Sequence, residues 1–435
     1  MSLYKLAGTL DFITKDALQA LQWQRLESNI KHAYENVAWY RKRLSEKGLT
    51  PKDIRSLDDL HKLPFIVKTD LRDTYPYGLF AVPFSEIVRL HASSGTTGKP
   101  IVCSYTRDDI EVWKEVVVRA LMSFGLHQGD ILQNSYGYGL FTGGLGLHYG
   151  AEALGLAVVP VSGGNTERQI MLMRDFGVTA ISCTPSYFIH ILDKAKQMGV
   201  DFHDLPLRIG VFGAEPWTEA MRKVIEAESG IKAYDIYGLT EISGPGVGAE
   251  CCFQNGTHLF EDHYYPEIVD PETLEPVPDG EYGELVFTAL DKKAMPLIRY
   301  RTRDITRLST TPCPCGRTLR RMEKISHRSD DMFIIRGVNV FPGQIESALL
   351  AVEGSLPHYQ IILTRDNGLD NVEVQVEVSQ EMFGDTVRSL EKLQGDIQRR
   401  IESTVGIRVK LTLVEPNRIP RSEGKAKRVF DNREI

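Results

Sequence analysis

The sequence predicts an α/β protein with two parts: a large N-terminal domain, whose mainly parallel sheet is covered by helices, and a small mobile α+β domain at the C-terminus. The first observation is length, because 435 residues exceed the usual size of one hydrophobic core. The second is an alternation of short apolar runs with helical segments in the middle of the chain, which is typical of parallel strands joined by helices. The third is a change of pattern near Asp330, after which strands follow one another closely.

Composition and charge limit the classes of function. Hydrophobic residues make up 42% of the chain and charged residues 25%, as in ordinary globular proteins. The net charge of -7 disfavours general binding to nucleic acids or to anionic membranes. The first residues lack the apolar core of a signal sequence, and His148 and Glu152 interrupt the most apolar window, 139–161. We therefore expect a cytoplasmic protein without nucleic-acid or membrane partners.

The first predicted elements are helices to which we assign a role in packing and no functional role. Apolar residues recur at helical spacing over 15–46, which indicates one or two long amphipathic helices. A further helix is expected to start near Lys68, with Thr69 or Asp70 as its N-cap.

Eight residues without a bulky side chain follow at 93–100. Their glycines let backbone amides close around a polyanion, while the hydroxyls and the lysine donate to its oxygens. The spacing G-x-x-G-K differs from the G-x-x-x-x-G-K-[ST] loop of common NTPases, and Pro100 stands where the magnesium-binding hydroxyl would be. For such a cluster in isolation, a flexible turn is the alternative. The residues of this candidate phosphate loop are Ser93, Ser94, Gly95, Thr96, Thr97, Gly98 and Lys99.

The alternating region then supplies the parallel sheet. Its expected strands lie at 157–161, 180–183 and 207–212, and its expected helices at 168–176 and 218–228. Ala214, Glu215 and Pro216 directly follow the third strand. Loops at the carboxyl ends of parallel strands are where ligands bind, and small residues there let a flat ring approach the backbone.

A second candidate binding stretch is 235–241, which begins with Asp235 and Ile236. Tyr237 beside Gly238 can stack on a base, and the Thr240 hydroxyl can bond a phosphate oxygen. The Glu241 carboxylate can hold magnesium on that phosphate. A strand that ends in a capped turn is the alternative.

The strand expected at 300–304 carries a further candidate. Alternation places Tyr300, Thr302 and Asp304 on one face, and an aspartate at a strand end can accept both hydroxyls of a ribose. A salt-bridged strand is the alternative for Arg301-x-Arg303-Asp304 alone.

The C-terminal pattern is that of a β-α-β-β-α-β unit. Its strands are expected at 333–335, 358–364, 371–379 and 407–414, and its helices at 342–352 and 384–404. The domains are therefore predicted to span 1–329 and 330–435. The tail, 420–428, is predicted to be a mobile loop with basic side chains, which include Lys425 and Lys427. A solvated basic terminus is the alternative.

These stretches occur in the order found in the adenylate-forming superfamily, which contains acyl-CoA synthetases, nonribosomal peptide adenylation domains and firefly luciferase. The chain resembles this superfamily from Ser93 to Arg428, and 299–346 most resembles its phenylacetate-CoA ligase branch. The large domain is shorter than in other members, as is usual in this branch.

The resemblance implies roles for single residues. It implies that 93–99 bind the triphosphate of ATP, that Ala214, Glu215 and Pro216 contact the adenine, and that Tyr237 stacks on it within a nucleotide site that includes Asp235 and Gly238. Thr240 matches a contact to the α-phosphate, Glu241 the magnesium ligand, Asp304 the ribose clamp and Arg328 an arginine that reaches ribose or phosphate. Asp330 matches the hinge, Lys425 (with Lys427 left open) the catalytic lysine, and Gly337, Val338 and Asn339 the wall of the pantetheine tunnel for coenzyme A.

The implied activity is that of an ATP-dependent, AMP-forming acid–CoA ligase of small aryl acids, with phenylacetate as the first choice. A carboxylate oxygen attacks the α-phosphate, pyrophosphate leaves, and a thiolate then takes the acyl group. Adenylylation of a deazaflavin cofactor and a non-catalytic nucleotide-binding protein are the alternatives, and a homodimer is left open.

Glycines alternate with aromatic residues at 136–144, which suits a flat ring, with core packing as the alternative. The residues expected around the acid are Tyr136, Phe141, Ala214 and Ile236.

Cysteine and histidine spacing adds a candidate metal site. Four of the six cysteines form two close pairs, Cys251-Cys252 and Cys313-Pro314-Cys315. With His258, residues Cys251, Cys313 and Cys315 have the composition of a closed structural zinc site, although Cys252 competes with Cys251. Unliganded reduced thiols are the alternative.

Overall fold

The centre of the large domain is an eight-stranded sheet. The structure is a computed structural model, and it describes residues 9–93, 100–309, 311–335, 338–366, 369–379, 382 and 387–433. In spatial order the strands are β13 (Arg321–Met322), β9 (Thr257–Leu259), β8 (Gly244–Ala249), β7 (Lys232–Leu239), β6 (Ile209–Phe212), β5 (Ala180–Cys183), β3 (Ile131–Asn134) and β4 (Ala157–Val159). From β4 to β7 the strands are parallel, and the other three are antiparallel to their neighbours. The predicted mainly parallel sheet is therefore confirmed.

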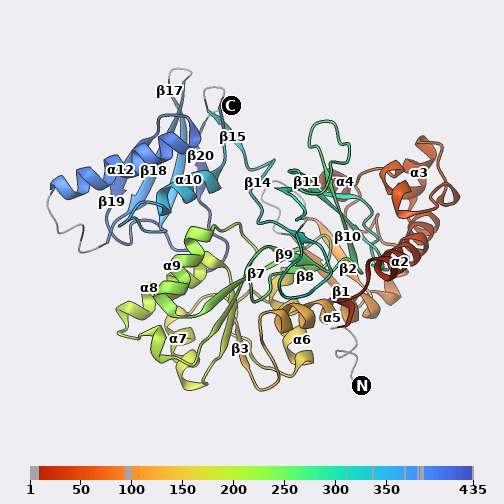
Figure 1. Ribbon diagram of the computed structural model, residues 1–435, viewed down its shortest axis with the longest axis horizontal. Helices are drawn as coiled ribbons and strands as arrows, with labels where there is room; N and C mark the ends of the chain where they lie inside the picture. The colour runs from red at the N-terminus through yellow and green to blue at the C-terminus, as the bar shows by residue number, and fades with distance from the viewer. Residues whose placement is uncertain are drawn as a thin grey trace.

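Helices cover both faces of this sheet (Figure 1). Helices α5 (Arg107–Ser123) and α6 (Thr142–Leu154) pack on one face, and α7 (Thr166–Asp175), α8 (Pro185–Gln197) and α9 (Glu219–Ser229) on the other. Consecutive residues of one strand pack into different cores. Val211 belongs to the core on the α5 side, whereas Phe212 belongs to the core beneath α7 to α9. The central strands are buried on both faces, which explains why they appear as continuous apolar runs in the sequence.

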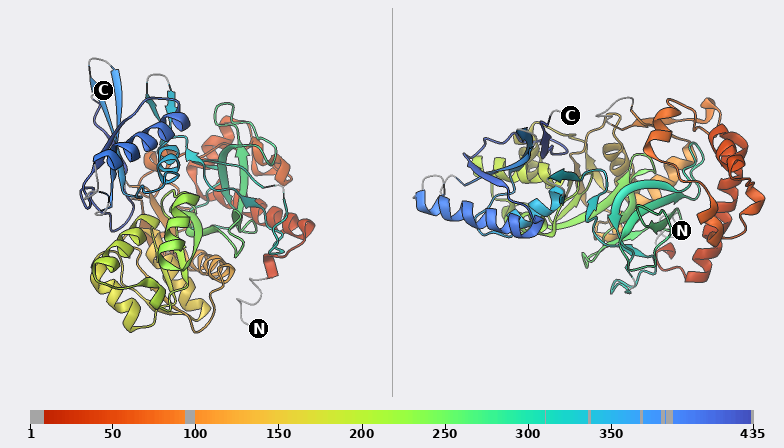
Figure 2. Two further views of the ribbon diagram at one scale, coloured as in Figure 1. Left: turned by 60° about the vertical axis from the view of Figure 1, so that its left-hand side comes forward. Right: turned by 90° about the horizontal axis from the view of Figure 1, so that it is seen from above.

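The N-terminal segment forms the helices expected from its periodicity. They are α2 (Lys15–Asn36) and α3 (Ala38–Glu46), followed by α4 (Lys68–Asp73) and 3₁₀ turns at Pro51–Asp53, Leu57–Lys62 and Phe84–Glu86. The predicted cap of α4 is wrong. Val67 is the N-cap, and the Asp70 carboxylate reaches back to accept the Val67 N–H at 2.9 Å. Helices α2 and α3 lie at the opposite end of the molecule from the small domain (Figure 2).

An antiparallel sheet completes the large domain. Its order is β10 (Tyr264–Val269), β11 (Gly283–Ala289), β12 (Tyr300–Thr306) and β14 (His327–Arg328). A separate hairpin of β1 (Arg89–Ala92) and β2 (Val102–Tyr105) flanks residues 93–101, and a 3₁₀ turn lies at Phe202–Asp204. Among the described residues, no helix is both long and apolar enough to span a bilayer.

The C-terminal unit is an α+β layer, as expected, with one correction. Its mixed sheet has the order β19 (Lys410–Val414), β18 (Leu369–Glu377), β17 (Tyr359–Asp366) and β20 (Val429–Asp431), covered by α10 (Pro342–Leu350) and α12 (Val387–Val405). The predicted first strand, β15 (Phe333–Ile335), does not join this sheet but pairs with β16 (Val338–Val340). The fourth strand of the sheet is instead β20. Its three residues are too few to give a strand pattern in the sequence beside the basic tail.

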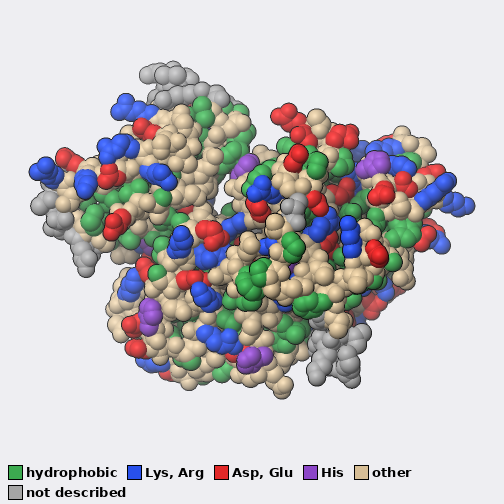
Figure 3. Space-filling model, viewed as in Figure 1, with side chains coloured by type: hydrophobic (Ala, Val, Ile, Leu, Met, Phe, Trp, Pro, Cys, Tyr) green, Lys and Arg blue, Asp and Glu red, His purple; other side chains and the backbone are tan. Residues whose placement is uncertain are grey.

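The small domain contacts the large domain on one side only of the face in view (Figure 3). On the face shown in Figure 3, a notch separates the small domain from the antiparallel-sheet side of the large domain. Their contacts lie instead at α8, α9 and the tail, as in the ion pair of 2.7 Å between His358 Nε2 and Asp193 Oδ2. The last large-domain strand ends at Arg328 and β15 begins at Phe333, so the boundary at Asp330 and the mobility of the small domain stay predictions.

Candidate active site

The loop after β6 lies beside the second half of β7, because these strands are parallel neighbours and Phe212, the last residue of β6, pairs with Asp235. Gly213 allows the close approach: a Cβ atom at this position would lie 2.4 Å from the Ile236 carbonyl oxygen. Ala214 adopts a positive φ of 69° and is exposed, and Glu215 follows it. Burial raises the pKa of Asp235, which lies at the same edge. The loop with Ala214, Glu215 and Pro216, which the resemblance assigns to the adenine, thus lies beside the strand that carries Tyr237.

A chain of polar contacts joins β7 to the predicted hinge. The Tyr237 hydroxyl donates to Asp304 Oδ2 at 2.6 Å, and Arg328 Nη1 donates to Asp304 Oδ1 at 3.1 Å. Arg328 also binds both oxygens of the Asp330 carboxylate, at 2.9 and 3.0 Å. Burial raises the pKa of Asp304 to about 6, and the Arg328 charge opposes that rise. Tyr237, Asp304 and Arg328 therefore form one unit, which sequence spacing alone did not indicate.

The turn at Thr240 and Glu241 faces the start of α6. The Thr240 and Thr142 hydroxyl oxygens are 3.4 Å apart, and Thr142 is the first residue of that helix. The Glu241 side chain is buried, and among the described residues its carboxylate has no hydrogen-bond or ion-pair partner. Backbone N–H groups at a helix N-terminus attract anions, so this corner can accept a phosphate group.

Lys292 supports this turn from beneath, and sequence analysis did not identify it. Its ammonium group donates to the carbonyl oxygens of Glu241 and Ile242 at 3.0 and 2.7 Å and lies 4.7 Å from the centre of the Tyr105 ring. The side chain is buried, which lowers its pKa. The neighbouring Lys293 is exposed and pairs with Asp108. Two adjacent lysines give no sequence signal of which one is buried.

The tail brings Lys425 to the large domain. Thr184 donates to the Gly424 carbonyl oxygen at 2.9 Å, and the Ala426 N–H donates to Glu215 Oε2 at 2.9 Å. The Lys425 side chain itself is exposed. Lys427 instead lies 4.8 Å from the centre of the Phe430 ring, within the small domain. This geometry favours Lys425 over Lys427 as the lysine that reaches the site.

Two aromatic residues of the expected acid site flank one glycine. A Cβ atom at Gly143 would lie 2.7 Å from the Phe141 ring and 3.4 Å from the Tyr136 ring. Tyr136 is buried, and its hydroxyl donates to the Cys183 carbonyl oxygen at 2.6 Å, whereas Phe141 is 38% exposed. Ile236 is buried on β7, and Ala214 is exposed on the next loop. The structure therefore places the rings of Tyr136 and Phe141 around Gly143, and the role of these residues in binding the acid stays a prediction.

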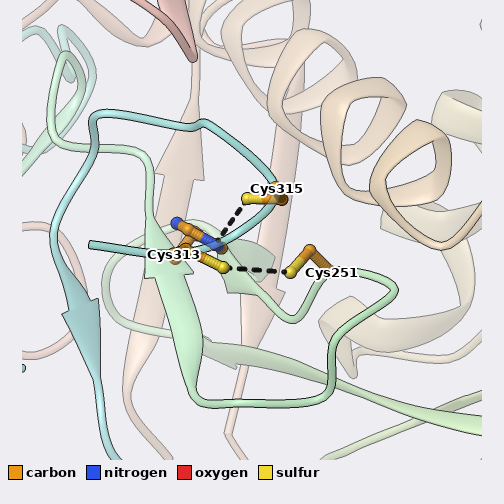
Figure 4. A group of neighbouring side chains, drawn as sticks. Cys251, Cys313 and Cys315 are labelled. Atoms are coloured by element: carbon orange, nitrogen blue, oxygen red, sulfur yellow. Dashed lines mark hydrogen bonds between the residues drawn. The ribbon is translucent and has the colours of Figure 1, made fainter. Parts of the chain in front are cut away.

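Cys251 from the loop after β8 and Cys313 and Cys315 from the loop before β13 point toward one another (Figure 4), and His258 joins them from β9. Cys251 Sγ lies 3.6 Å from Cys313 Sγ, and Cys315 Sγ lies 3.4 Å from His258 Nε2. All four ligand atoms lie within 4.8 Å of one another. Cys252 is exposed and points elsewhere, so Cys251 is the member of that pair that joins the cluster.

Part of the predicted site lies outside the described residues, namely Ser94, Gly95, Thr96, Thr97, Gly98, Lys99 and Gly337. Ser93 is described, and its hydroxyl accepts the Ile101 N–H at 3.3 Å. Val338 and Asn339 lie on the β15–β16 hairpin near the C-terminus (Figure 1), and their role in the pantetheine tunnel stays a prediction.

Comparisons with known proteins agree with this arrangement. The model of the AMP-binding enzyme family matches residues 83–289, and that of the AMP-binding enzyme C-terminal domain matches 337–433. A phenylacetate-coenzyme A ligase of Thermus thermophilus is 52% identical over 438 residues, which cover 98% of each chain. The chain belongs to the AMP-binding enzymes, in the phenylacetate-coenzyme A ligase family. Recognition of this family from the motifs is confirmed.

Solved structures of a relative bear on how the two domains of this AMP-binding enzyme are arranged. A 2-hydroxyisobutyryl-CoA ligase in the postadenylation state, with a bound acyl-AMP, superposes with a TM-score of 0.90 at 30% identity, covering 96% of this chain and 90% of that one. The same ligase in the thioesterification state gives 0.71 at the same identity, covering 97% and 91%. Because identity and coverage hardly differ, the two scores reflect different conformations of that ligase. This structure is more similar to the one in the postadenylation state.

Proposed function

We propose that the chain is an ATP-dependent, AMP-forming phenylacetate–CoA ligase. The observation that carries the proposal is the match to the Thermus thermophilus enzyme over nearly the whole of both chains. The geometry supports it in two ways. The Thr240–Glu241 turn directly follows β7, and the Lys425 loop is hydrogen-bonded to Glu215 in the loop after β6, which together with the adjacent part of β7 we call the nucleotide edge.

In the first half-reaction, a carboxylate oxygen of the acid attacks the α-phosphorus of ATP. The new P–O bond forms as the bond to pyrophosphate breaks, which gives an acyl-AMP. Because two anions must meet, the reaction requires cations at the developing charge. Lys425 supplies one from the tail, Thr240 binds the α-phosphate, and Asp304 accepts the ribose hydroxyls.

The described residues fit a magnesium ion at Glu241. The Glu241 carboxylate, which has no partner among the described residues, is a hard oxygen ligand of the kind that Mg²⁺ prefers. When bound with ATP, this ion would neutralise phosphate charge. Lys292 holds the backbone of the same turn, so it fixes where the Glu241 carboxylate lies.

In the second half-reaction, the thiolate of coenzyme A attacks the acyl carbon, the C–O bond breaks, and AMP leaves. This step requires the Lys425 loop to withdraw and admit the thiol. A rotation near Asp330 would exchange that loop for the hairpin with Val338 and Asn339, whose partner in the tunnel would be Gly337. The bidentate Arg328–Asp330 pair holds this point in the present arrangement.

The acid is proposed to be a small arylacetate that lies against Tyr136, Phe141 and Ile236. These side chains are uncharged, and the Tyr136 hydroxyl is already bonded to the backbone, so the surface disfavours a second carboxylate. A pocket that is deeper by one methylene group changes the binding free energy of the acid by about 1–3 kcal/mol, which is enough to discriminate between rings of different size.

A structural zinc ion is proposed at Cys251, His258, Cys313 and Cys315. Tetrahedral coordination at ordinary bond lengths places two thiolate sulfurs about 3.8 Å apart and a sulfur and a nitrogen about 3.6 Å apart. The observed 3.6 and 3.4 Å are close to these separations. Such an ion would tie the loop after β8 to the loop before β13.

A screen of acids tests the proposed function. AMP release is measured with ATP, coenzyme A and each of phenylacetate, acetate, a long-chain fatty acid and a deazaflavin acceptor. We expect the highest kcat/KM with phenylacetate, together with a strict requirement for coenzyme A. Formation of an adenylylated deazaflavin with release of pyrophosphate and without coenzyme A, or a higher kcat/KM for acetate or the fatty acid, would overturn the assignment.

A further inference from the structure

The Glu215 carboxylate bridges the two domains. Its Oε1 accepts the backbone N–H of Ser186 at 2.8 Å, within the first turn of α8, and its Oε2 accepts the backbone N–H of Ala426 at 2.9 Å. The first donor belongs to the large domain and the second to the tail. The side chain therefore links the start of α8 to the tail through two hydrogen bonds, and we call this link the Glu215 strut.

The bond to the tail lies directly beside Lys425. Thr184 donates to the carbonyl oxygen of Gly424, and Glu215 accepts from the N–H of Ala426. The backbone is thus held by the large domain on both sides of Lys425, while the lysine side chain is left exposed and free to reach a ligand. Fixing the backbone reduces the conformational freedom that the ammonium group loses when it binds the reacting phosphate.

The environment of Glu215 supports a charged strut. Burial raises the pKa of this carboxyl, but both N–H groups and the nearby Arg428 oppose that rise. The start of α8, a helix of 13 residues, adds its partial positive charge. Both bonds are therefore charge-assisted, which makes them stronger than bonds between neutral groups.

We propose that Glu215 is a positioning residue for adenylation: its carboxylate holds the Lys425 loop over the nucleotide edge and releases it before thioester formation. The inference rests on the proposed function, because it assigns the residue to one half-reaction of that function. It differs from the expectation that Glu215 only contacts adenine, since the side chain is directed to Ser186 and Ala426.

The main test compares the half-reactions in a Glu215→Gln variant. Glutamine keeps the size of the side chain but has no charge and turns an NH₂ group toward one of the two N–H donors. We expect the kcat of phenylacetate-dependent pyrophosphate release to fall about 10- to 100-fold, the range for a lost charge-assisted hydrogen bond. The KM for ATP should stay within about twofold, and conversion of supplied phenylacetyl-AMP to phenylacetyl-CoA should not fall.

The matched control is Glu228→Gln. Glu228 pairs with Lys196 at the other end of α8, at 3.0 Å, and does not touch the tail. This variant should behave as wild type in both half-reactions. A rise in the KM for ATP with an unchanged kcat in Glu215→Gln would instead assign Glu215 to the adenine and overturn the proposal.

A double-mutant cycle shows whether Glu215 acts through Lys425. If it does, Glu215→Gln causes no further loss of adenylation once Lys425 is already alanine. A full additional loss in the Lys425→Ala background would contradict the proposal. If Glu215→Gln does not fold, Glu215→Asp takes its place: it keeps the charge but is too short for both bonds, and we expect a smaller loss with the same dependence on Lys425.

Limited proteolysis tests the strut without any substrate. Trypsin cleaves after Lys425 only when the loop leaves the large domain, so we expect Glu215→Gln to raise the cleavage rate at this peptide bond several-fold, and Glu228→Gln to leave it unchanged. An unchanged rate in Glu215→Gln would contradict the strut even if the acid screen confirms the ligase. Faster cleavage in a protein without ligase activity would support the strut and reject the proposed function.

Discussion

Replacement of Lys425 by alanine should separate the two half-reactions. The side chain is exposed, and its ammonium group makes no ion pair with a described residue, so folding should be unaffected. In the adenylation transition state, a unit charge about 4 Å from a phosphate oxygen contributes ~4 kcal/mol at an effective dielectric constant of about 20. Loss of that contribution lowers the rate about 10³-fold. Thioester formation, for which the loop has withdrawn, should be preserved.

The assay measures pyrophosphate release from ATP and phenylacetate, and separately the conversion of supplied phenylacetyl-AMP to phenylacetyl-CoA. Lys427→Ala is the matched control, because this lysine packs on Phe430 in the small domain. It should reduce neither half-reaction more than about twofold. Equal losses of both half-reactions in Lys425→Ala would refute the exchange of domain faces, and a larger loss in Lys427→Ala would show that the other lysine is catalytic.

Three further predictions follow from the site. Purified protein should contain about one zinc ion per chain, and Cys313→Ser should lower the Tm by about 5 °C or more while the turnover of the folded fraction changes little; a metal-free protein with unchanged melting would contradict the site. Because burial raises the pKa of Asp304 to about 6, this carboxyl is protonated below that pH and accepts ribose hydroxyls poorly, so kcat/KM for ATP should rise as pH increases through about 6, whereas Asp304→Asn should abolish this inflection. Lys292→Met leaves two buried carbonyl oxygens without their donor and should lower both the Tm and the adenylation rate, whereas Lys293→Met should do neither; equal effects of the two would contradict the support of the turn.

Much of the fold follows from local pattern. The strand at Ala180–Cys183 has the predicted bounds, because it is a short and mostly apolar segment between two helical patterns. The small domain shows where pattern fails. Phe333–Ile335 is apolar enough for a central strand, yet it forms a separate hairpin, and the short β20 completes the sheet. Which strand occupies an edge is decided by tertiary packing, on which three-residue segments carry almost no information.

Part of the candidate site could likewise be predicted from the sequence, and part could not. Tyr237 and Asp304 were each predicted from their own motifs, but their mutual hydrogen bond joins residues 67 positions apart, and no local pattern encodes it. The cysteine cluster was predictable because soft ligands in two close pairs are rare, and the structure selects Cys251 over Cys252. Lys292 could not be predicted, because only the folded turn shows that it lies beneath Glu241.

Oxygen transfer tests the central claim most directly. Phenylacetate labelled with ¹⁸O in both carboxylate oxygens is converted with ATP and coenzyme A, and the nucleotide and phosphate products are analysed by mass spectrometry. If the carboxylate attacks the α-phosphorus, each AMP formed carries one ¹⁸O and the pyrophosphate carries none. Unlabelled AMP, or ADP together with labelled phosphate, would contradict an acyl-AMP intermediate and the proposed roles of the Thr240–Glu241 turn and Lys425.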